Sequence, residues 1–215
     1  MKILITGASQ GIGLAIARLF LQRGHEVLGL DVLGPGLSHE KYTHLRADIS
    51  ADPLPDVDGV EILINNAGVQ DSGRDIEVNL QGSMRVTERY AFQSAIRSVL
   101  FIASASAHTG AEFPAYAASK GGLVAYMKNV ALRLAAYGAT SNSLSPGGVT
   151  TALNAHVMED PELWRRIMAE TLLPKWASPE EIAQWAYFVT AVNRSMTAQD
   201  VLIDNGEAAK ANFIW

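Results

Sequence analysis

The chain of 215 residues contains no cysteine. Disulfides and thiolate metal sites are therefore excluded, and the composition fits a reducing compartment such as the cytoplasm. No apolar run reaches the ~20 residues that a membrane-spanning helix needs. Because the first apolar run begins at residue 2, we also expect no signal peptide. These features predict a cytoplasmic protein without a membrane partner.

Dense runs of basic residues are also missing. The net charge is −5, from 17 lysines and arginines against 22 aspartates and glutamates, so we expect no nucleic-acid partner. The five histidines lack the spacing of metal ligands, and we expect no metal. With 48% hydrophobic and 18% charged residues, the composition is that of an ordinary globular protein. We predict one domain over residues 1–215.

Apolar runs of strand length alternate with stretches of helical spacing. Strands are expected near residues 2–6, 26–31, 42–47, 61–64, 98–103, 139–144 and 200–204, and helices near 12–23, 79–97, 116–137, 161–170 and 179–192. This order predicts an α/β fold, a doubly wound parallel sheet of about seven strands with helices on both faces (a Rossmann fold), with ligands at the carboxyl ends of the strands. Glycines and a proline at 34–36 predict a loop between the second and third strands.

A glycine-rich turn joins the first strand to the first helix and reads Gly7-Ala8-Ser9-Gln10-Gly11-Ile12-Gly13. Glycines let the backbone approach a pyrophosphate, and the helix directs unpaired N–H groups toward it. The spacing G-x-x-x-G-x-G differs from the general dinucleotide pattern G-x-G-x-x-G, and the absence of a following Lys-Ser/Thr disfavours a nucleotide triphosphatase. The alternative is a tight turn in which the glycines only ease packing.

The second strand ends at Asp31, eighteen positions after Gly13. An acid at about this distance binds the adenosine ribose hydroxyls in dinucleotide sites, and it would repel the ribose phosphate of NADP. The glycine turn also lacks a basic residue. These residues favour NAD over NADP. The alternative is that Asp31 is an ordinary strand-end cap.

Tyr116 and Lys120 are four residues apart in an expected helix, which places a phenol and an ammonium on one face. A nearby positive charge lowers the pKa of a tyrosine from its ordinary value of about 10 and favours the phenolate. Tyr116 is therefore a candidate for proton transfer. The alternative is a half-buried tyrosine beside a solvated lysine.

Further motifs follow one another in a fixed order. They are Thr6-Gly7-x-x-x-Gly11-x-Gly13, Asn65-Asn66-Ala67-Gly68, Asn79, Ser104, Tyr116-x-x-x-Lys120 and Pro146-Gly147. With these motifs the chain resembles the short-chain dehydrogenase/reductase family over nearly its whole length. The resemblance implies an oxidoreductase with a single Rossmann domain that binds NAD.

The resemblance also implies roles for four residues. Tyr116 would give or take the proton of the alcohol or ketone oxygen, and Lys120 would bind the nicotinamide ribose and lower the tyrosine pKa. Ser104 would hold the substrate oxygen, with Ser106 as its rival, because the loop before Tyr116 allows one residue of slack. Asn79 would keep a water in a proton relay, and the alternative for Asn79 is a helix N-cap.

By position, the resemblance assigns the cofactor contacts, with Asp48 near the adenine and Pro146 onward beside the nicotinamide amide. The full set is Gly7, Ser9, Gln10, Gly11, Ile12, Gly13, Asp31, Asp48, Ile49, Asn65, Ala67, Gly68, Tyr116, Lys120, Pro146, Gly147, Val149 and Thr151, with Thr150 as the alternative to Thr151. Residues 152–178 stand in the place of the family's substrate lid. The alternative for this stretch is simple core packing.

Family members are commonly dimers or tetramers, so the resemblance implies a homodimer or homotetramer that buries helices 79–97 and 116–137 and the apolar tail 212–215. The leading hypothesis is an NAD-dependent oxidoreductase that interconverts a secondary alcohol and a ketone on a small molecule. The alternative is an NAD-binding sensor or scaffold without turnover, which the presence of Tyr116 and Lys120 disfavours. An epimerase or dehydratase of the longer sister branch would need a second domain, for which the chain has no residues to spare.

Overall fold

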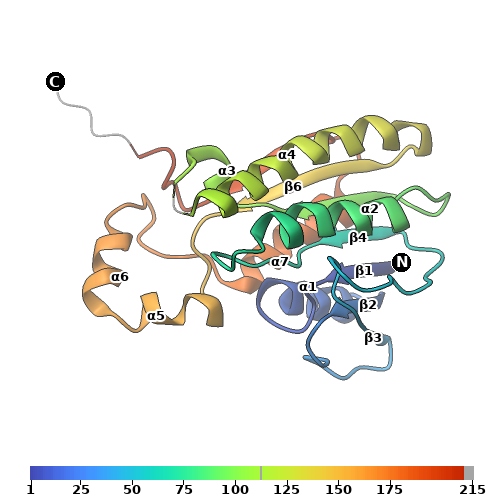
Figure 1. Ribbon diagram of the computed structural model, residues 1–215, viewed down its shortest axis with the longest axis horizontal. Helices are drawn as coiled ribbons and strands as arrows, with labels where there is room; N and C mark the ends of the chain where they lie inside the picture. Colours follow the sequence, from blue (N-terminus) through green and yellow to red (C-terminus); the bar gives the residue numbers. More distant parts are fainter. Residues whose placement is uncertain (112, 211–215) are drawn as a thin grey trace.

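The computed structural model describes residues 1–111 and 113–210. Its centre is one all-parallel sheet in the order β3-β2-β1-β4-β5-β6-β7 (Figure 1). The strands are β1 (Lys2–Thr6), β2 (Glu26–Asp31), β3 (Tyr42–Arg46), β4 (Ile62–Asn65), β5 (Ser98–Ile102), β6 (Thr140–Pro146) and β7 (Asp200–Ile203). The strand order reverses between β1 and β4, which opens a crevice at their carboxyl ends. The predicted fold class is confirmed.

Helices cover both faces of the sheet. Successive residues of a strand point to opposite faces, so each strand supplies side chains to both helix layers. Ile3 and Ile5 pack in the cluster under α1 (Gly11–Gln22) and α7 (Pro179–Tyr187), and Leu4 packs in the cluster under α2 (Ser83–Tyr90) and α4 (Pro114–Leu134). Figure 1 shows α2 and α4 on one side and α1 and α7 on the other. Shorter turns extend these helices: η1 (Ile76–Gly82), η2 (Ala135–Tyr137) and η4 (Phe188–Val192). Among the residues that the structure describes, no helix is both long enough and apolar enough to cross a bilayer.

The predicted helix 79–97 is wrong at both ends. The helical segment begins with the π-helical turn at Ile76, after Asp75, whose carboxylate accepts hydrogen bonds from the N–H groups of Asp71 and Ser72. It ends at Tyr90, where the Gln93 side chain donates to the Tyr90 carbonyl at 2.8 Å. Residues 91–97 are irregular. The Gln93 side chain thus satisfies one of the carbonyls that the end of a helix leaves without an intrahelical partner.

One connection folds as the sequence predicts, and one helix begins earlier than predicted. Residues 32–41 contain no helix and cross from β2 to β3 as a loop. The predicted helix 116–137 begins two residues earlier, at Pro114, because proline is well suited to the first helical turn.

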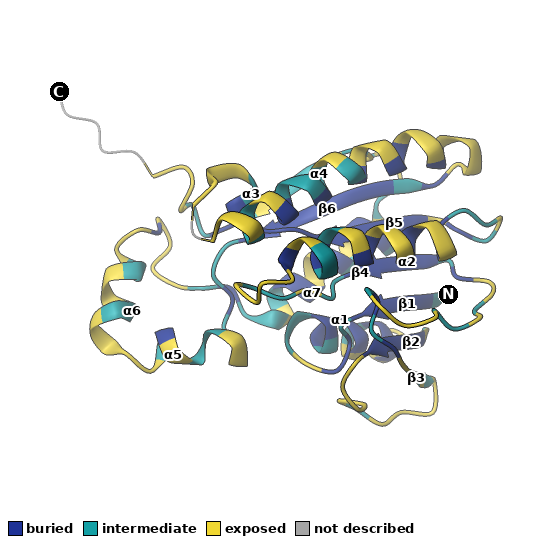
Figure 2. Ribbon diagram, in the orientation of Figure 1, coloured by how far each residue is buried: buried dark blue, intermediate teal, exposed yellow. Residues whose placement is uncertain are grey.

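The segment from 152 onward projects away from the sheet (Figure 1) and is mostly exposed or half-buried (Figure 2). It consists of η3 (Ala152–Asn154), α5 (Ala155–Met158) and α6 (Pro161–Met168), followed by an irregular return to Ser178. Trp164 packs edge-on against Trp176 with ring centres 5.1 Å apart. The tail 212–215, expected at a subunit interface, lies outside the described residues.

Candidate active site

The glycine turn between β1 and α1 is held in one tight conformation. Gly7 and Gly11 have left-handed backbones, with φ of 68° and 53°, and a Cβ at Gly13 would lie 2.0 Å from the Gly7 carbonyl oxygen. The Asn66 amide donates to the carbonyls of Thr6 and Gly7, both at 3.0 Å. Among the residues that the structure describes, no side chain caps the start of α1, and the hydroxyl of the buried Ser9 has no hydrogen-bond partner. This backbone cradle and its unpaired donors fit the pyrophosphate of a dinucleotide.

Asp31 ends β2 beside this turn. Its two carboxylate oxygens accept hydrogen bonds at 2.9 Å from the N–H groups of Ser9 and Leu33, and the residue is buried. The loop after Asp31 returns over the turn, since a Cβ at Gly36 would lie 2.0 Å from the Ser9 carbonyl oxygen. The carboxylate is thus fixed at the edge of the glycine turn.

Asp48 and Ile49 follow β3, away from the main cavity. The Asp48 carboxylate accepts hydrogen bonds from the Ser50 hydroxyl at 2.6 Å and lies 3.5 Å from the Arg74 guanidinium. The Ser50 hydrogen bonds and the Arg74 charge hold the pKa of Asp48 below its ordinary value. The Ile49 side chain is buried against Gly82.

Two serines lie where β5 runs into the short helix α3 (Ser106–Thr109). The hydroxyl groups of Ser104 and Ser106 are 3.3 Å apart, and the Ser104 hydroxyl accepts the Ser106 N–H at 3.2 Å. Both residues are buried and both line the same cavity. Both serines can therefore present a hydroxyl to a substrate oxygen in this cavity.

Tyr116 and Lys120 lie on one face near the start of α4. The Lys120 Nζ is 5.6 Å from the centre of the Tyr116 ring and donates to the Ile102 carbonyl at 2.9 Å. Lys120 is buried, not solvated. Burial lowers the pKa of Lys120 to about 8, while the charge of Asp75 acts in the opposite direction. The ammonium therefore remains charged at neutral pH and faces the tyrosine ring.

Asn79 lies inside the π-helical turn, so the N-cap interpretation is wrong. Its side-chain amide donates to the Val69 carbonyl at 2.9 Å and to the Ser119 hydroxyl at 3.0 Å, and its oxygen accepts the Val69 N–H at 2.7 Å. Because Ser119 precedes Lys120, Asn79 joins the loop after β4 to the helix that carries the tyrosine. Irregular π turns occur frequently at functional sites.

The Asn65 side chain points away from the site and donates to the Thr87 hydroxyl at 3.0 Å. The next residue, Asn66, lines the cavity instead. Ala67 is held by its N–H bond to the Thr6 hydroxyl at 3.0 Å. A Cβ at Gly68 would lie 3.0 Å from the Asn79 Oδ1 and 3.4 Å from the Lys120 Nζ, so a larger residue there would crowd the Asn79 side chain.

A cavity of about 470 Å³ lies above the sheet, within the range of small-molecule sites. The predicted residues that line it are Ile12, Gly68, Ser104, Tyr116, Lys120, Pro146, Gly147, Val149 and Thr151. The other predicted residues do not line it, namely Gly7, Ser9, Gln10, Gly11, Gly13, Asp31, Asp48, Ile49, Asn65, Ala67 and Asn79. The cavity thus joins the serines, the tyrosine and the lysine to one end of the expected cofactor site.

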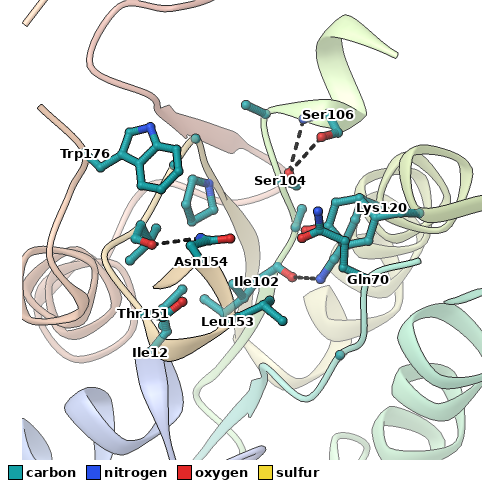
Figure 3. Close-up of a pocket in the computed structure, with 18 of the residues that line it drawn as sticks. Ile12, Gln70, Ile102, Ser104, Ser106, Lys120, Thr151, Leu153, Asn154 and Trp176 are labelled. Atoms are coloured by element: carbon teal, nitrogen blue, oxygen red, sulfur yellow. Dashed lines mark hydrogen bonds between the residues drawn. The ribbon is translucent and has the colours of Figure 1, made fainter. Parts of the chain in front are cut away.

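Two residues of the expected lid segment 152–178 line the cavity, and so does Gln70, which the sequence did not single out. Trp176 and Asn154, from the projecting segment, lie across it from Gln70 and Lys120 (Figure 3). The Asn154 amide donates to the Val149 carbonyl at 2.8 Å, and its oxygen points into the cavity (Figure 3). Gln70 follows the Asn65-Asn66-Ala67-Gly68 motif by two residues, and this closeness was the available signal for it. Among the residues described here, no cluster of three or more acids and histidines could hold a metal.

The chain is similar to known proteins in both sequence and structure. A family model described as Enoyl-(Acyl carrier protein) reductase matches residues 51–207. Glucose 1-dehydrogenase of Gluconobacter oxydans is 27% identical, over 99% of this chain and 93% of that protein. The structure of 4-hydroxyisoleucine dehydrogenase complexed with NADH is 26% identical with a TM-score of 0.84, covering 98% of this chain and 99% of that one.

An Agrobacterium tumefaciens protein, assigned as a 2-deoxy-d-gluconate 3-dehydrogenase and solved with bound NADP, is 25% identical. Its TM-score is 0.85, over 97% of this chain and 96% of that one. Both nicotinamide cofactors therefore occur among these similar structures.

Proposed function

The chain belongs to the short-chain dehydrogenase/reductase family of oxidoreductases, and we propose that it uses NAD to interconvert a secondary alcohol and a ketone. The observation that carries the proposal is one cavity lined by Ser104, Tyr116 and Lys120 together with Ile12 at the start of α1. Proton transfer, orientation of the substrate oxygen and cofactor binding each have a group of suitable chemistry there.

The residues present fit a nicotinamide dinucleotide. The glycine turn and the bare start of α1 would hold the pyrophosphate, and Asp31 would accept the adenosine ribose hydroxyls, which favours NAD. Pro146 to Thr151 line the cavity on the side that would receive the nicotinamide. When bound, NAD supplies the hydride chemistry that the side chains lack.

Tyr116 would remove the hydroxyl proton of the alcohol at its phenolate oxygen and return it in the reductive direction. Lys120 favours the phenolate because its ammonium lies 5.6 Å from the ring centre in a buried setting. Ser104, or Ser106, would donate a hydrogen bond to the substrate oxygen. Asn79 fixes the loop at Val69 against α4, and we propose that it also holds the water of a proton relay.

The projecting segment 152–178 is proposed as the substrate lid, supported by Asn154 and Trp176 on the cavity wall. We also propose a homodimer or homotetramer. Leu132 is 77% exposed on α4, the helix that the resemblance places at the subunit interface. Sedimentation of the purified protein measures the subunit number. The cytoplasmic location stays a prediction from the cysteine-free composition.

Turnover of a panel of secondary alcohols with NAD, followed by the absorbance of reduced nicotinamide, tests the function. The wild type should turn over at least one alcohol, and Tyr116→Phe should lose activity by a factor of about 10² to 10⁴ while it still binds NAD. Tyr126→Phe is the matched control, because that phenol lies on the same helix but donates to Glu88 at 2.9 Å. Equal, negligible turnover in wild type and Tyr116→Phe, with intact NAD binding, would instead indicate a sensor.

A further inference from the structure

Asp200, the first residue of β7, carries a carboxylate for which the proposed reaction has no role. Its side chain is only 7% exposed. It accepts a hydrogen bond from His108 Nε2 at 2.5 Å, from the Ser143 hydroxyl at 2.5 Å and from the Ser145 hydroxyl at 2.9 Å. A buried carboxylate with three donors is well stabilised, and the donors come from two other segments of the chain.

The order of these contacts excludes a hydrolytic triad. In such a triad a serine donates to a histidine and the histidine donates to the acid. Here both serine hydroxyls donate directly to Asp200, so neither is activated by His108. A carboxylate can only accept, which places the histidine proton on Nε2. We call Asp200, His108, Ser143 and Ser145 the tether, because they join separate segments of the chain and neither serine is an activated nucleophile.

The tether connects the segment of the two cavity serines to the sheet edge. His108 lies on α3, which begins at Ser106 and precedes the loop to Tyr116. Ser143 and Ser145 lie on β6, directly before Pro146 and Gly147 of the cavity wall. The Asp200 carboxylate thus contacts both the helix that follows Ser104 and the strand that leads to the expected nicotinamide contacts at Pro146 and Gly147.

Backbone bonds to β6 fix this segment of the chain as far as Ala105. The N–H groups of Ala103 and Ala105 donate to the Leu144 and Pro146 carbonyls at 2.7 and 2.8 Å, which extends β5 along β6. Beyond this point, the His108 side chain joins α3 to Asp200 of the edge strand β7. Because α3 also packs against α4, loss of the His108 contact should loosen its position relative to the sheet without releasing it.

We propose that His108 and Asp200 are positioning residues, which fix α3 and thereby hold the Ser106 hydroxyl, and through their 3.3 Å contact the Ser104 hydroxyl, at the distance from Tyr116 that substrate binding needs. The kinetic part of this inference rests on the proposed function. Neither residue lines the cavity, so neither is a catalytic residue. A small displacement of a positioned group lowers the rate because the reacting atoms lose alignment.

The first test compares His108→Ala with His108→Gln, whose amide N–H can still donate to Asp200. His108→Ala should lower kcat about ten-fold, within the range known for small misplacements, with the dissociation constant of NAD unchanged. His108→Gln should recover most of the activity. His39→Ala, in the exposed crossover loop, is the histidine control and should match the wild type. A His108→Ala enzyme with wild-type kcat, or a glutamine variant no better than alanine, would overturn the proposal.

Hydrogen exchange gives a readout that does not depend on turnover. The N–H groups of residues 107–110 bond to carbonyls of residues 104–106, and they should exchange faster in His108→Ala than in the wild type or His108→Gln. Exchange in the middle of α4 should stay unchanged. If the wild type oxidises no alcohol, the proposed function fails, yet the exchange experiment still decides whether the tether holds α3. Unchanged exchange at residues 107–110 would refute it.

Discussion

Replacing the buried Lys120 by methionine should make the protein more stable at neutral pH while removing its function. Burial lowers the pKa of Lys120 from 10.5 to about 8, which means that the folded protein holds the ammonium at a cost. The difference corresponds to about 3 kcal/mol, at about 1.4 kcal/mol for each pH unit. Methionine has a similar length and no charge to bury.

The direction of the pH dependence follows from proton counts. Below about pH 8 both states carry the proton, and above about pH 10.5 neither does. Between these values the unfolded chain is protonated and the folded protein is not, so the free energy of unfolding rises with pH across this window. The wild type should gain about 3 kcal/mol relative to Lys120→Met between about pH 7 and pH 10.5.

At neutral pH, the free energy of unfolding of Lys120→Met should exceed that of the wild type by less than this pH-dependent change of about 3 kcal/mol. Lys120 Nζ donates to the Ile102 carbonyl at 2.9 Å, and a buried carbonyl without its partner costs about 1–3 kcal/mol. We therefore expect Lys120→Met to be more stable than the wild type by up to about 2 kcal/mol below pH 8, the difference between these two quantities. NAD binding should weaken, because the cation beside the expected ribose is gone. Stability gained at the expense of function is common at active sites.

Equilibrium urea unfolding, followed by the fluorescence of the four tryptophans, measures both quantities at each pH. Buried tyrosines such as Tyr90, whose pKa burial raises, titrate alike in both proteins, so their effect cancels in the difference. Lys128→Met, at an exposed position of the same helix, should follow the wild type at every pH. Parallel curves for wild type and Lys120→Met would refute the reasoning.

Replacing Asp75 by asparagine tests the cause of the Lys120 pKa shift. The negative charge of Asp75 raises the pKa of Lys120 against the effect of burial, so its removal should move the start of the window below pH 8. Asp71→Asn is the control, since Asp71 is exposed on the same loop.

Other substitutions test the cofactor site and the scaffold. Asp31→Ala should weaken NAD binding about ten-fold, equivalent to about 1.4 kcal/mol, and should improve NADP binding; an unchanged preference in paired titrations would contradict the NAD assignment. Gly13→Ala should cost about 1–3 kcal/mol and reduce NAD affinity, because its Cβ would lie 2.0 Å from the Gly7 carbonyl oxygen. Gly121→Ala, where an added Cβ meets nothing within 4 Å, should leave NAD titrations unaltered. Ser178→Ala should lower the free energy of unfolding by about 1 kcal/mol, since Ser178 and Glu181 form a reciprocal cap on α7; no change in urea unfolding would contradict this.

Local signals in the sequence determined the alternation of strands and helices, the glycine turn and the helical spacing of Tyr116 and Lys120. These features depend on residues that are neighbours in the chain, whose side-chain periodicity and backbone freedom are the same in any surroundings. The parallel sheet follows from their order, because strands joined through helices pair in one direction.

Contacts between distant residues were decided only by the tertiary structure. The choice of Asn66 over Asn65 as the cavity residue follows from how β4 ends against Thr87. Lys120 is buried because the loop at Gly68 and the end of β5 close around its ammonium. His108 meets Asp200 across 92 positions of the chain. Burial and long-range hydrogen bonds depend on where the remainder of the chain lies, and no local pattern records that position.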